Sequence, residues 1–258
     1  MLRERIAPNA SPMTLDGTRT YAVGVQRVAV IDPGPAHPAH LEGIVADAAP
    51  GRIVAILLTH IHPDHAAGAD PLSRATGAPV LSRAAGTLEP GRRIATDAGD
   101  LIAVATPGHT PDHVAFHWPA QDTVFCGDLM MGGLDTALVA SPEGDLGDYL
   151  ASLALLRSLD PRIVLPAHGP AFTEPQVAIG RYITHRRERQ GQVLAAIDAG
   201  AADVASIVEH VYGASLDPAL REAAEAAVEA YIAHLLGHGR LDRDATGRLR
   251  RSGGHEAG

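Results

Sequence analysis

Short apolar runs alternate with polar turns over the first two thirds of the chain. Polar and apolar positions alternate from Met13 to Ile31 around Gly17 and Gly24, and within this stretch Thr20–Val25 and Arg27–Ile31 are predicted to form a hairpin. Further apolar runs predict strands at Ile53–Leu58, Pro79–Ser82, Leu101–Thr106, Val114–Trp118, Thr123–Cys126 and Ile163–Leu165. Helical spacing of apolar residues predicts helices at Pro38–Ala49, Ala69–Thr76 and Leu146–Leu159. This mixture of hairpins and strand–helix units indicates an α/β or α+β fold with about nine strands or more.

After Glu174 the pattern becomes helical. Helices are predicted at Pro175–Ala199, Val204–Tyr212 and Pro218–Leu236, followed by strand, turn and strand within Gly239–Arg251. Three helices and a hairpin predict a winged-helix-like appendage that begins near Thr173. We therefore expect one domain over residues 1–172, a C-terminal domain over residues 173–251, and a disordered tail over residues 252–258.

Composition narrows the classes of protein. The chain has 258 residues, of which 46% are hydrophobic, so it can bury a full core. It contains no apolar run of roughly 18 residues and no apolar N-terminal stretch, so we expect neither a membrane partner nor a signal peptide. A single cysteine, Cys126, fits a reducing compartment, and we expect a cytoplasmic protein. The net charge of -9 argues against non-specific binding of nucleic acid, and we expect no binding of duplex DNA.

Candidate chemistry begins where the apolar run ending at Leu58 stops. His60, His62, Asp64 and His65 follow within a few positions. Loops beyond the carboxyl ends of strands commonly carry sites, and imidazoles with a carboxylate suit zinc, manganese or iron. His60 and His62 can point the same way from an extended segment, whereas Asp64 and His65 follow a turn. The spacing therefore indicates two adjacent metal positions.

The segment Thr59-His60-Ile61-His62-Pro63-Asp64-His65 resembles the T-H-x-H-x-D-H signature of the metallo-β-lactamase superfamily. The later motifs of that family are resembled in order by Thr106-Pro107-Gly108-His109-Thr110, Phe125-Cys126-Gly127-Asp128 and Pro166-Ala167-His168-Gly169-Pro170. Within the superfamily, Asn9 to Gly24 and Tyr182 to Arg189 resemble the β-lactamase-like protein 2 branch. The resemblance implies an α+β fold of αββα type, a four-layer sandwich with the site at one edge, here with the winged-helix-like appendage attached.

The resemblance also implies a ligand set and two divalent ions, with zinc expected and manganese or iron as alternatives. One metal position would be formed by His60, His62 and His109, and the other by Asp64, His65 and His168, with Asp128 bridging both. A two-metal site of this kind supplies a metal-bound hydroxide, which would attack a small ester, thioester or lactone. Asp64 is expected to be catalytic as well as a ligand, because it can orient the hydroxide and pass a proton to the leaving group.

Asp128 separates this chain from most true zinc β-lactamases, which resemble it elsewhere but carry Cys or Ser at the matching position. We therefore expect no hydrolysis of β-lactam drugs. Two alternatives stay open: a single-strand endoribonuclease at the same metals, and a mononuclear iron persulfide dioxygenase. A non-enzymatic scaffold is disfavoured because every proposed ligand is present.

Four residues outside the motifs are candidates for substrate binding. His113 lies shortly after His109, Met130 follows Asp128, and Arg186 and Arg189 lie three apart on one predicted helix. Each has an alternative role: a structural histidine, a core methionine, and a solvated or salt-bridged helix face. The expected partner is a small-molecule substrate, with RNA and a second copy of the chain left open.

Overall fold

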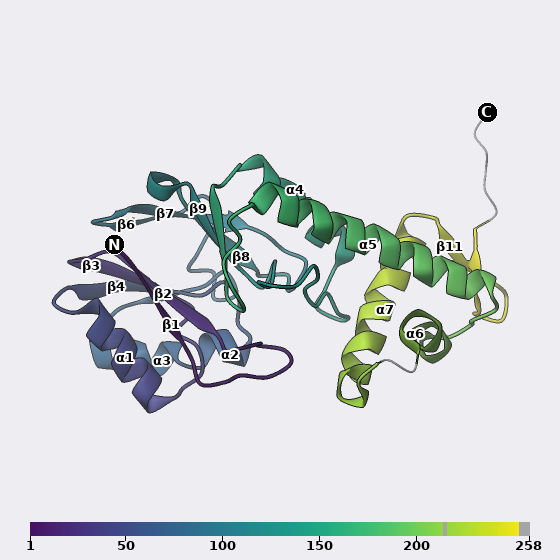
Figure 1. Cartoon of the computed structure of the whole chain (residues 1–258), viewed down its shortest axis with the longest axis horizontal. Coiled ribbons are helices and arrows are strands. Elements are labelled where there is room, and N and C mark those ends of the chain that lie inside the picture. Colours follow the sequence, from purple (N-terminus) through teal and green to yellow (C-terminus); the bar gives the residue numbers. More distant parts are fainter. Residues whose placement is uncertain (214–215, 253–258) are drawn as a thin grey trace.

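The computed structural model describes residues 1–213 and 216–252, and its N-terminal part contains two sheets face to face with helices outside them (Figure 1). The first sheet has the order β1 (Leu2–Ile6), β2 (Arg19–Val23), β3 (Arg27–Ile31), β4 (Arg52–Leu57) and β5 (Val80–Leu81). The second has the order β10 (Ile163–Pro166), β9 (Thr123–Gly127), β8 (Val114–Trp118), β7 (Gly99–Ala105) and β6 (Arg93–Thr96). A short 3-10 helix, η1 (Pro119–Gln121), connects β8 to β9.

The side chains of β4 show which face of the first sheet is which. Ala55 and Leu57 pack between the two sheets, whereas Ile56 faces the opposite side. Ile53 also faces that opposite side, because the pairing of β3 with β4 shifts register between Ile53 and Ala55. On that outer face of the first sheet lie α1 (Pro38–Ala48) and α3 (Ala69–Thr76). The outer face of the second sheet is covered by α4 (Leu146–Ser158). The α+β, αββα architecture is therefore confirmed, and β4 is buried on both faces.

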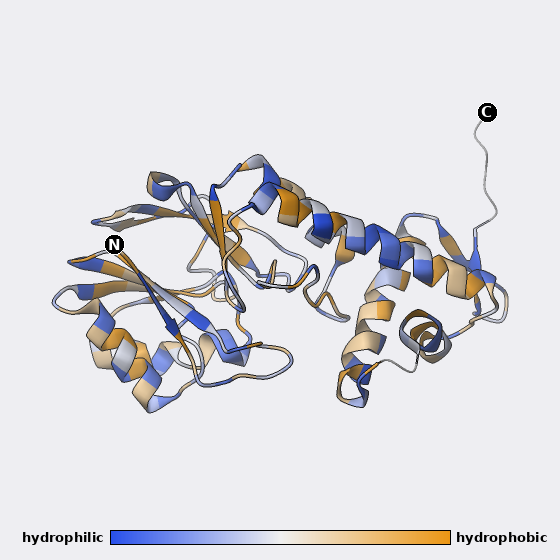
Figure 2. Cartoon of the chain, in the orientation of Figure 1, coloured by the Kyte–Doolittle hydropathy of each residue, from blue (hydrophilic) through white to orange (hydrophobic). Residues whose placement is uncertain are grey.

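The C-terminal elements extend away from the sheets on the long helix α5 (Figure 1). They are α5 (Pro175–Asp198), α6 (Val204–Tyr212), η3 (Pro218–Leu220), α7 (Arg221–Gly237) and the antiparallel hairpin of β11 (Leu241–Arg243) and β12 (Leu249–Arg251). Figure 2 shows a hydrophilic middle of α5 between more apolar turns. One apolar cluster continues from α4 through α5 to α7, so these helices pack on the sandwich.

Three helices and a hairpin lie where the sequence predicts them, and the winged-helix comparison and the division at residues 172 and 173 stay predictions. The predicted disordered tail lies, apart from Ser252, outside the described residues. No helix among the described residues combines the length and apolar character needed to cross a bilayer.

Four features of the secondary structure differ from the sequence expectations. The pattern does not predict β1 or β6, because β1 reads Leu-Arg-Glu-Arg-Ile with exposed or half-buried side chains and β6 has only four residues. The predicted turn at Pro63 is instead a short helix, α2 (Pro63–Ala66). The third C-terminal helix is divided into η3 and α7.

Candidate metal centre

All the predicted ligands come together at one edge of the sandwich. The strands β3 and β4 run parallel, as do β9 and β10, so the segments that follow them reach the same edge. His60 and His62 follow β4, Asp128 follows β9 and His168 follows β10. The loop after β7 brings His109, and α2 carries the two remaining candidates, Asp64 and His65.

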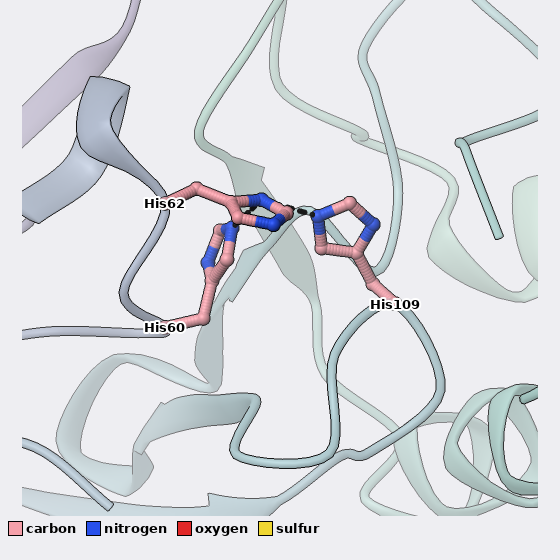
Figure 3. Close-up of side chains that lie close together, drawn as sticks. All are labelled: His60, His62 and His109. Atoms are coloured by element: carbon pink, nitrogen blue, oxygen red, sulfur yellow. Dashed lines mark hydrogen bonds between the residues drawn. The ribbon is translucent and has the colours of Figure 1, made fainter. Parts of the chain in front are cut away.

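Three imidazoles form the first group (Figure 3). Nδ1 of His62 lies 2.9 Å from Nε2 of His60 and 3.1 Å from Nε2 of His109. The ring of His62 is half-buried, whereas the other two are buried. One nitrogen of each ring therefore points to a shared centre.

Hydrogen bonds to the outer nitrogens fix which nitrogen faces that centre. The hydroxyl of Thr59 donates its only proton to Oδ2 of Asp32 at 2.7 Å, so it accepts a hydrogen bond from Nδ1 of His60 at 3.0 Å. Nδ1 of His109 donates to the carbonyl oxygen of Leu138 at 2.7 Å. Both imidazoles thus keep an unprotonated Nε2, which is the form that binds a metal ion.

The second group contains Asp64, His65 and His168. Oδ2 of Asp64 lies 3.3 Å from Nε2 of His65 and 3.3 Å from Nε2 of His168. Oδ1 of Asp128 lies 3.4 Å from Nε2 of His65 and 3.3 Å from Nε2 of His168. Oδ2 of Asp128 lies 3.6 Å from Nε2 of His109, so this carboxylate reaches toward both groups.

The arrangement fits metal ions on two observations. Nε2 of His65, Nε2 of His168 and Oδ1 of Asp128 are buried without a hydrogen-bond partner among the described residues, although buried polar atoms are nearly always paired. Ligand atoms on a tetrahedral ion with bonds of about 2.0–2.1 Å lie roughly 3.3 Å apart, which is close to the spacings in both groups. Imidazoles with carboxylates are also the donor set of zinc and iron sites.

Electrostatics in the second group favour a cation. Burial raises the pKa of Asp128, but His65 and His168 outweigh it and hold that pKa well below its ordinary value. Burial also opposes ionisation of Asp64, but the neighbouring imidazoles of His168 and His65 outweigh it and lower its pKa. The two carboxylates therefore remain ionised at neutral pH, and their charge is available to a bound cation.

The imidazoles of the centre differ in their protonation. Burial lowers the pKa of His60 well below its ordinary value, with His65 adding to the effect. Burial would also lower the pKa of His65, but Asp128 and Asp32 raise it well above the ordinary value. In His168, the nearby carboxylates of Asp128 and Asp64 overcome the effect of burial and raise the pKa to about 9. A metal ion at the second group would take the place of these protons.

Asp32 holds two residues of the centre in place through hydrogen bonds, and the sequence analysis did not predict this role. Its Oδ1 accepts the backbone N–H of Thr59 at 2.8 Å, and its Oδ2 accepts Nδ1–H of His65 at 2.9 Å. Asp32 is 1% exposed and directly follows β3, the parallel neighbour of β4. That position at the end of a central strand is the signal that could have found it.

The structure corrects the prediction that His113 binds substrate, because its ring is buried and both ring nitrogens are hydrogen-bonded to the protein. The backbone N–H of Asp128 donates to Nε2 of His113 at 3.2 Å, and Nδ1 donates to the hydroxyl of Thr106 at 2.8 Å. The ring is 0% exposed, and burial lowers its pKa to about 3. His113 is thus a neutral support for the backbone of Asp128.

Glycine is required beside two of the ligands. Gly108 precedes His109 with φ of 128°, and a Cβ there would lie 2.4 Å from the backbone nitrogen of Tyr149. Gly127 precedes Asp128 with φ of 51°, and a Cβ there would lie 2.6 Å from Nε2 of His113. At both positions the neighbouring atoms lie so close to the glycine that a larger residue would not fit without a shift.

Of the other residues predicted to bind substrate, Arg186 and Arg189 line a cavity and Met130 does not. Met130 is 0% exposed in the core, so its prediction is corrected; its neighbour Met131 lines a cavity instead. Arg186 and Arg189 line that same cavity, which lies between α5, α7 and the loop after β9. Leu138 also lines the cavity, and its carbonyl oxygen is the one that holds His109.

Comparison with known proteins gives a consistent picture. The family model described as the metallo-beta-lactamase superfamily matches residues 13–103 and 87–168. A beta-lactamase-like protein 2 homolog from Drosophila melanogaster is 34% identical over 211 residues, which cover 72% of this chain and 70% of that protein. An atrochrysone carboxyl ACP thioesterase from Aspergillus chevalieri is 28% identical over 266 residues, which cover 95% of this chain and 84% of that protein. A metallo-beta-lactamase family protein from Thermus thermophilus shares the fold, with a TM-score of 0.81, 19% identity, and coverage of 97% of this chain and 98% of that one.

Proposed function

Since the chain belongs to the metallo-β-lactamase superfamily, in its β-lactamase-like protein 2 branch, and is a metal-dependent hydrolase, we propose that it holds two divalent ions and hydrolyses a small ester, thioester or lactone. The observation that carries the proposal is the position of Asp128, whose two carboxylate oxygens reach toward different ligand groups. His60, His62 and His109 would hold one ion, and Asp64, His65 and His168 the other. A relative named as an ACP thioesterase supports the choice of acyl substrates.

When bound, two divalent ions supply a water of lowered pKa and a Lewis acid for the carbonyl group. The protein's own residues contribute orientation and proton transfer. Asp64 is the more exposed of the two carboxylates, with 29% of its side chain accessible against 14% for Asp128. Asp64 would accept a hydrogen bond from the attacking water and fix its direction. It would take up the proton that the water loses on adding to the carbonyl group, and pass that proton to the departing alcohol or thiol.

Metal analysis and a substrate panel test the proposal. We expect elemental analysis to find two divalent ions per chain, with zinc as the physiological metal. Chelation should abolish hydrolysis of esters, thioesters or lactones, and zinc should restore it better than manganese or iron. A protein with two ions and no activity on any of the three substrate classes would contradict the substrate proposal alone.

The same measurements separate the alternatives. One iron per chain with no zinc, together with oxygen consumption on persulfides, would replace this proposal by the mononuclear dioxygenase. Cleavage of single-stranded RNA that depends on both metals would favour the endoribonuclease. The second ligand group argues against a mononuclear site, because Nε2 of His65 and Nε2 of His168 are buried without a hydrogen-bond partner among the described residues.

A further inference from the structure

The cavity between α5, α7 and the loop after β9 has a mainly apolar lining. It has a volume of about 240 Å³ and is lined mainly by apolar side chains from the loop after β9 and from α7, among them Met131, Leu138, Ala223 and Ala227. Concave, largely apolar spaces with a few polar groups are where small ligands bind. The cavity is therefore suited to a hydrocarbon or aromatic body.

Two guanidinium groups line this cavity, and the more buried of them belongs to Arg186. Arg186 is 3% exposed, donates to the hydroxyl of Tyr231 at 3.1 Å and to the carbonyl oxygen of Ala137, and lies over the ring of Tyr149 at 4.7 Å. Its Nε is buried and has no hydrogen-bond partner among the described residues. These contacts are to neutral groups, so they leave the charge of Arg186 uncompensated.

Arg189 lies one turn along α5 and is half-buried. Its Nη1 donates to Oε1 of Gln192 at 2.8 Å, and its guanidinium lies 4.4 Å from the ring centre of Tyr212. Within the described part of the chain, neither Arg186 nor Arg189 forms an ion pair, unlike Arg181 of the same helix, which pairs with Asp135. A buried cation without a counter-ion is costly, and an anionic ligand in the cavity would lower that cost.

The cavity and the candidate metal centre share one loop, which contains Ala137 and Leu138. Arg186 holds the carbonyl oxygen of Ala137, and the carbonyl oxygen of the next residue, Leu138, holds Nδ1 of His109. A substrate whose remote part lies against Leu138 in the cavity would therefore lie against the loop that supports His109. Binding energy from such a remote part is what positions the reacting group.

We propose that this cavity is the acyl pocket of the enzyme, and that it selects acyl groups with an apolar body bearing a single carboxylate, which is held by Arg189 and Arg186. The proposal rests on the hydrolase function proposed above. A carboxylate is favoured over a phosphate because it carries one charge and is less costly to bring into an apolar cavity. Arginine also binds carboxylates through a matching planar geometry.

Calorimetric titration of the zinc-loaded full chain tests the pocket without using turnover. The probes are 2-naphthoate, its neutral isostere 2-naphthamide, and 2-naphthyl phosphate. We expect naphthoate to bind at least tenfold more tightly than the amide or the phosphate, a ratio of about tenfold corresponding to 1.4 kcal/mol. Equal affinities for the acid and the amide would overturn the charge assignment.

Variants locate the binding. Arg189→Gln should weaken naphthoate roughly tenfold and leave naphthamide unchanged, whereas Arg187→Gln, exposed on the same helix and outside the cavity, should change neither. Ala223→Leu, which fills the cavity, should weaken both probes by about tenfold or more. Ala233→Leu, exposed on α7 and outside this cavity, is the matched control.

Two outcomes would overturn the proposal. Naphthoate could lose its affinity on chelation while Arg189→Gln binds normally, which would place the carboxylate on the metals. Alternatively, Ala223→Leu could bind both probes as the natural chain does. A failure of the hydrolase proposal is seen separately, as absent turnover or a wrong metal content, while the pattern among probes and variants is unchanged.

Discussion

Asp32 sets the orientation of a metal-ligand candidate without contacting the centre itself. One carboxylate oxygen accepts hydrogen bonds from both the hydroxyl of Thr59 and Nδ1 of His65. The first bond fixes the proton of Thr59, and so the tautomer of His60, while the second fixes the ring of His65. Partners of this kind tune metal affinity although they touch no metal.

Asp32→Asn should reduce metal affinity by about 10- to 100-fold, since an amide nitrogen cannot accept these hydrogen bonds. Competition with a zinc-binding dye measures the change. The control is Asp47→Asn on α1, which alters an ion pair with Arg5 of β1. Thermal unfolding of the metal-free proteins would show whether the substitution acts through the fold. An unchanged zinc affinity in Asp32→Asn would remove Asp32 from this role.

His60→Ala and His168→Ala each delete a ligand from a different group. We expect both variants to lose turnover, with zinc content falling from two ions per chain, because no neighbouring side chain can replace an imidazole at the centre. Elemental analysis of the purified variants provides the measurement. Two ions per chain in both variants would refute the ligand assignment.

Residue spacing predicts which side chains gather at the centre but not which groups support them. The family motifs place seven candidates, and all seven lie within reach of one another at one sheet edge. Support from Leu138 comes from a backbone carbonyl, which any residue carries, so the sequence holds no signal for it. The predictions for His113 and Met130 were wrong for a related reason: proximity in sequence to a ligand does not reveal whether a side chain turns inward.

At the scale of elements, α4 holds the loop that carries His109. The carbonyl oxygen of Gly108 accepts the backbone N–H of Asp145, and the hydroxyl of Ser152 donates to the carbonyl oxygen of Pro107 at 2.7 Å. Gly108 touches the helix so closely that a Cβ would overlap the backbone of Tyr149. The position of this ligand is therefore set by helix packing.

Gly108→Ala should destabilise the fold by about 1–3 kcal/mol and weaken zinc binding, because the loop must move away from α4. Urea unfolding and zinc competition measure the two effects. Gly91→Ala is a matched control: Gly91 also has a positive φ, 83°, but a Cβ there meets nothing within 4 Å. Similar losses in both variants would mean that backbone strain, and not contact with α4, decides the outcome.

Elements with strong periodicity were predictable, and exposed edges were not. A run of apolar residues between a Pro-Gly turn and the histidines indicates β4. β1 lies at a sheet edge with Arg3, Glu4 and Arg5 in sequence, so its apolar content is too low to predict a strand. β6 is an edge strand as well, and its pairing with β7 stabilises it more than its own composition does.

At the scale of the whole molecule, the C-terminal helices line the cavity that shares Leu138 with the candidate metal centre. α5 brings Arg186 and Arg189 to it, and α7 contributes alanines and Tyr231. The opposite side of α7 is acidic, since Glu222 and Glu229 are exposed there. These features favour a role in shaping the pocket over a role in binding DNA.

Winged-helix modules often bind duplex DNA through their third helix, which makes DNA binding the sharpest test of this assignment. We expect no binding of random duplex below roughly 10 micromolar at about 100 mM salt, because the acidic side of α7 would repel phosphates. The basic hairpin does not reverse this, since Arg251 is paired with Asp198 at 2.9 Å and Arg250 lies opposite Asp242. Fluorescence anisotropy provides the measurement. Tight, salt-sensitive binding that is lost when the chain is cut after Gly200 would instead assign the C-terminal helices to nucleic acid, and would raise the endoribonuclease alternative above the acyl hydrolase.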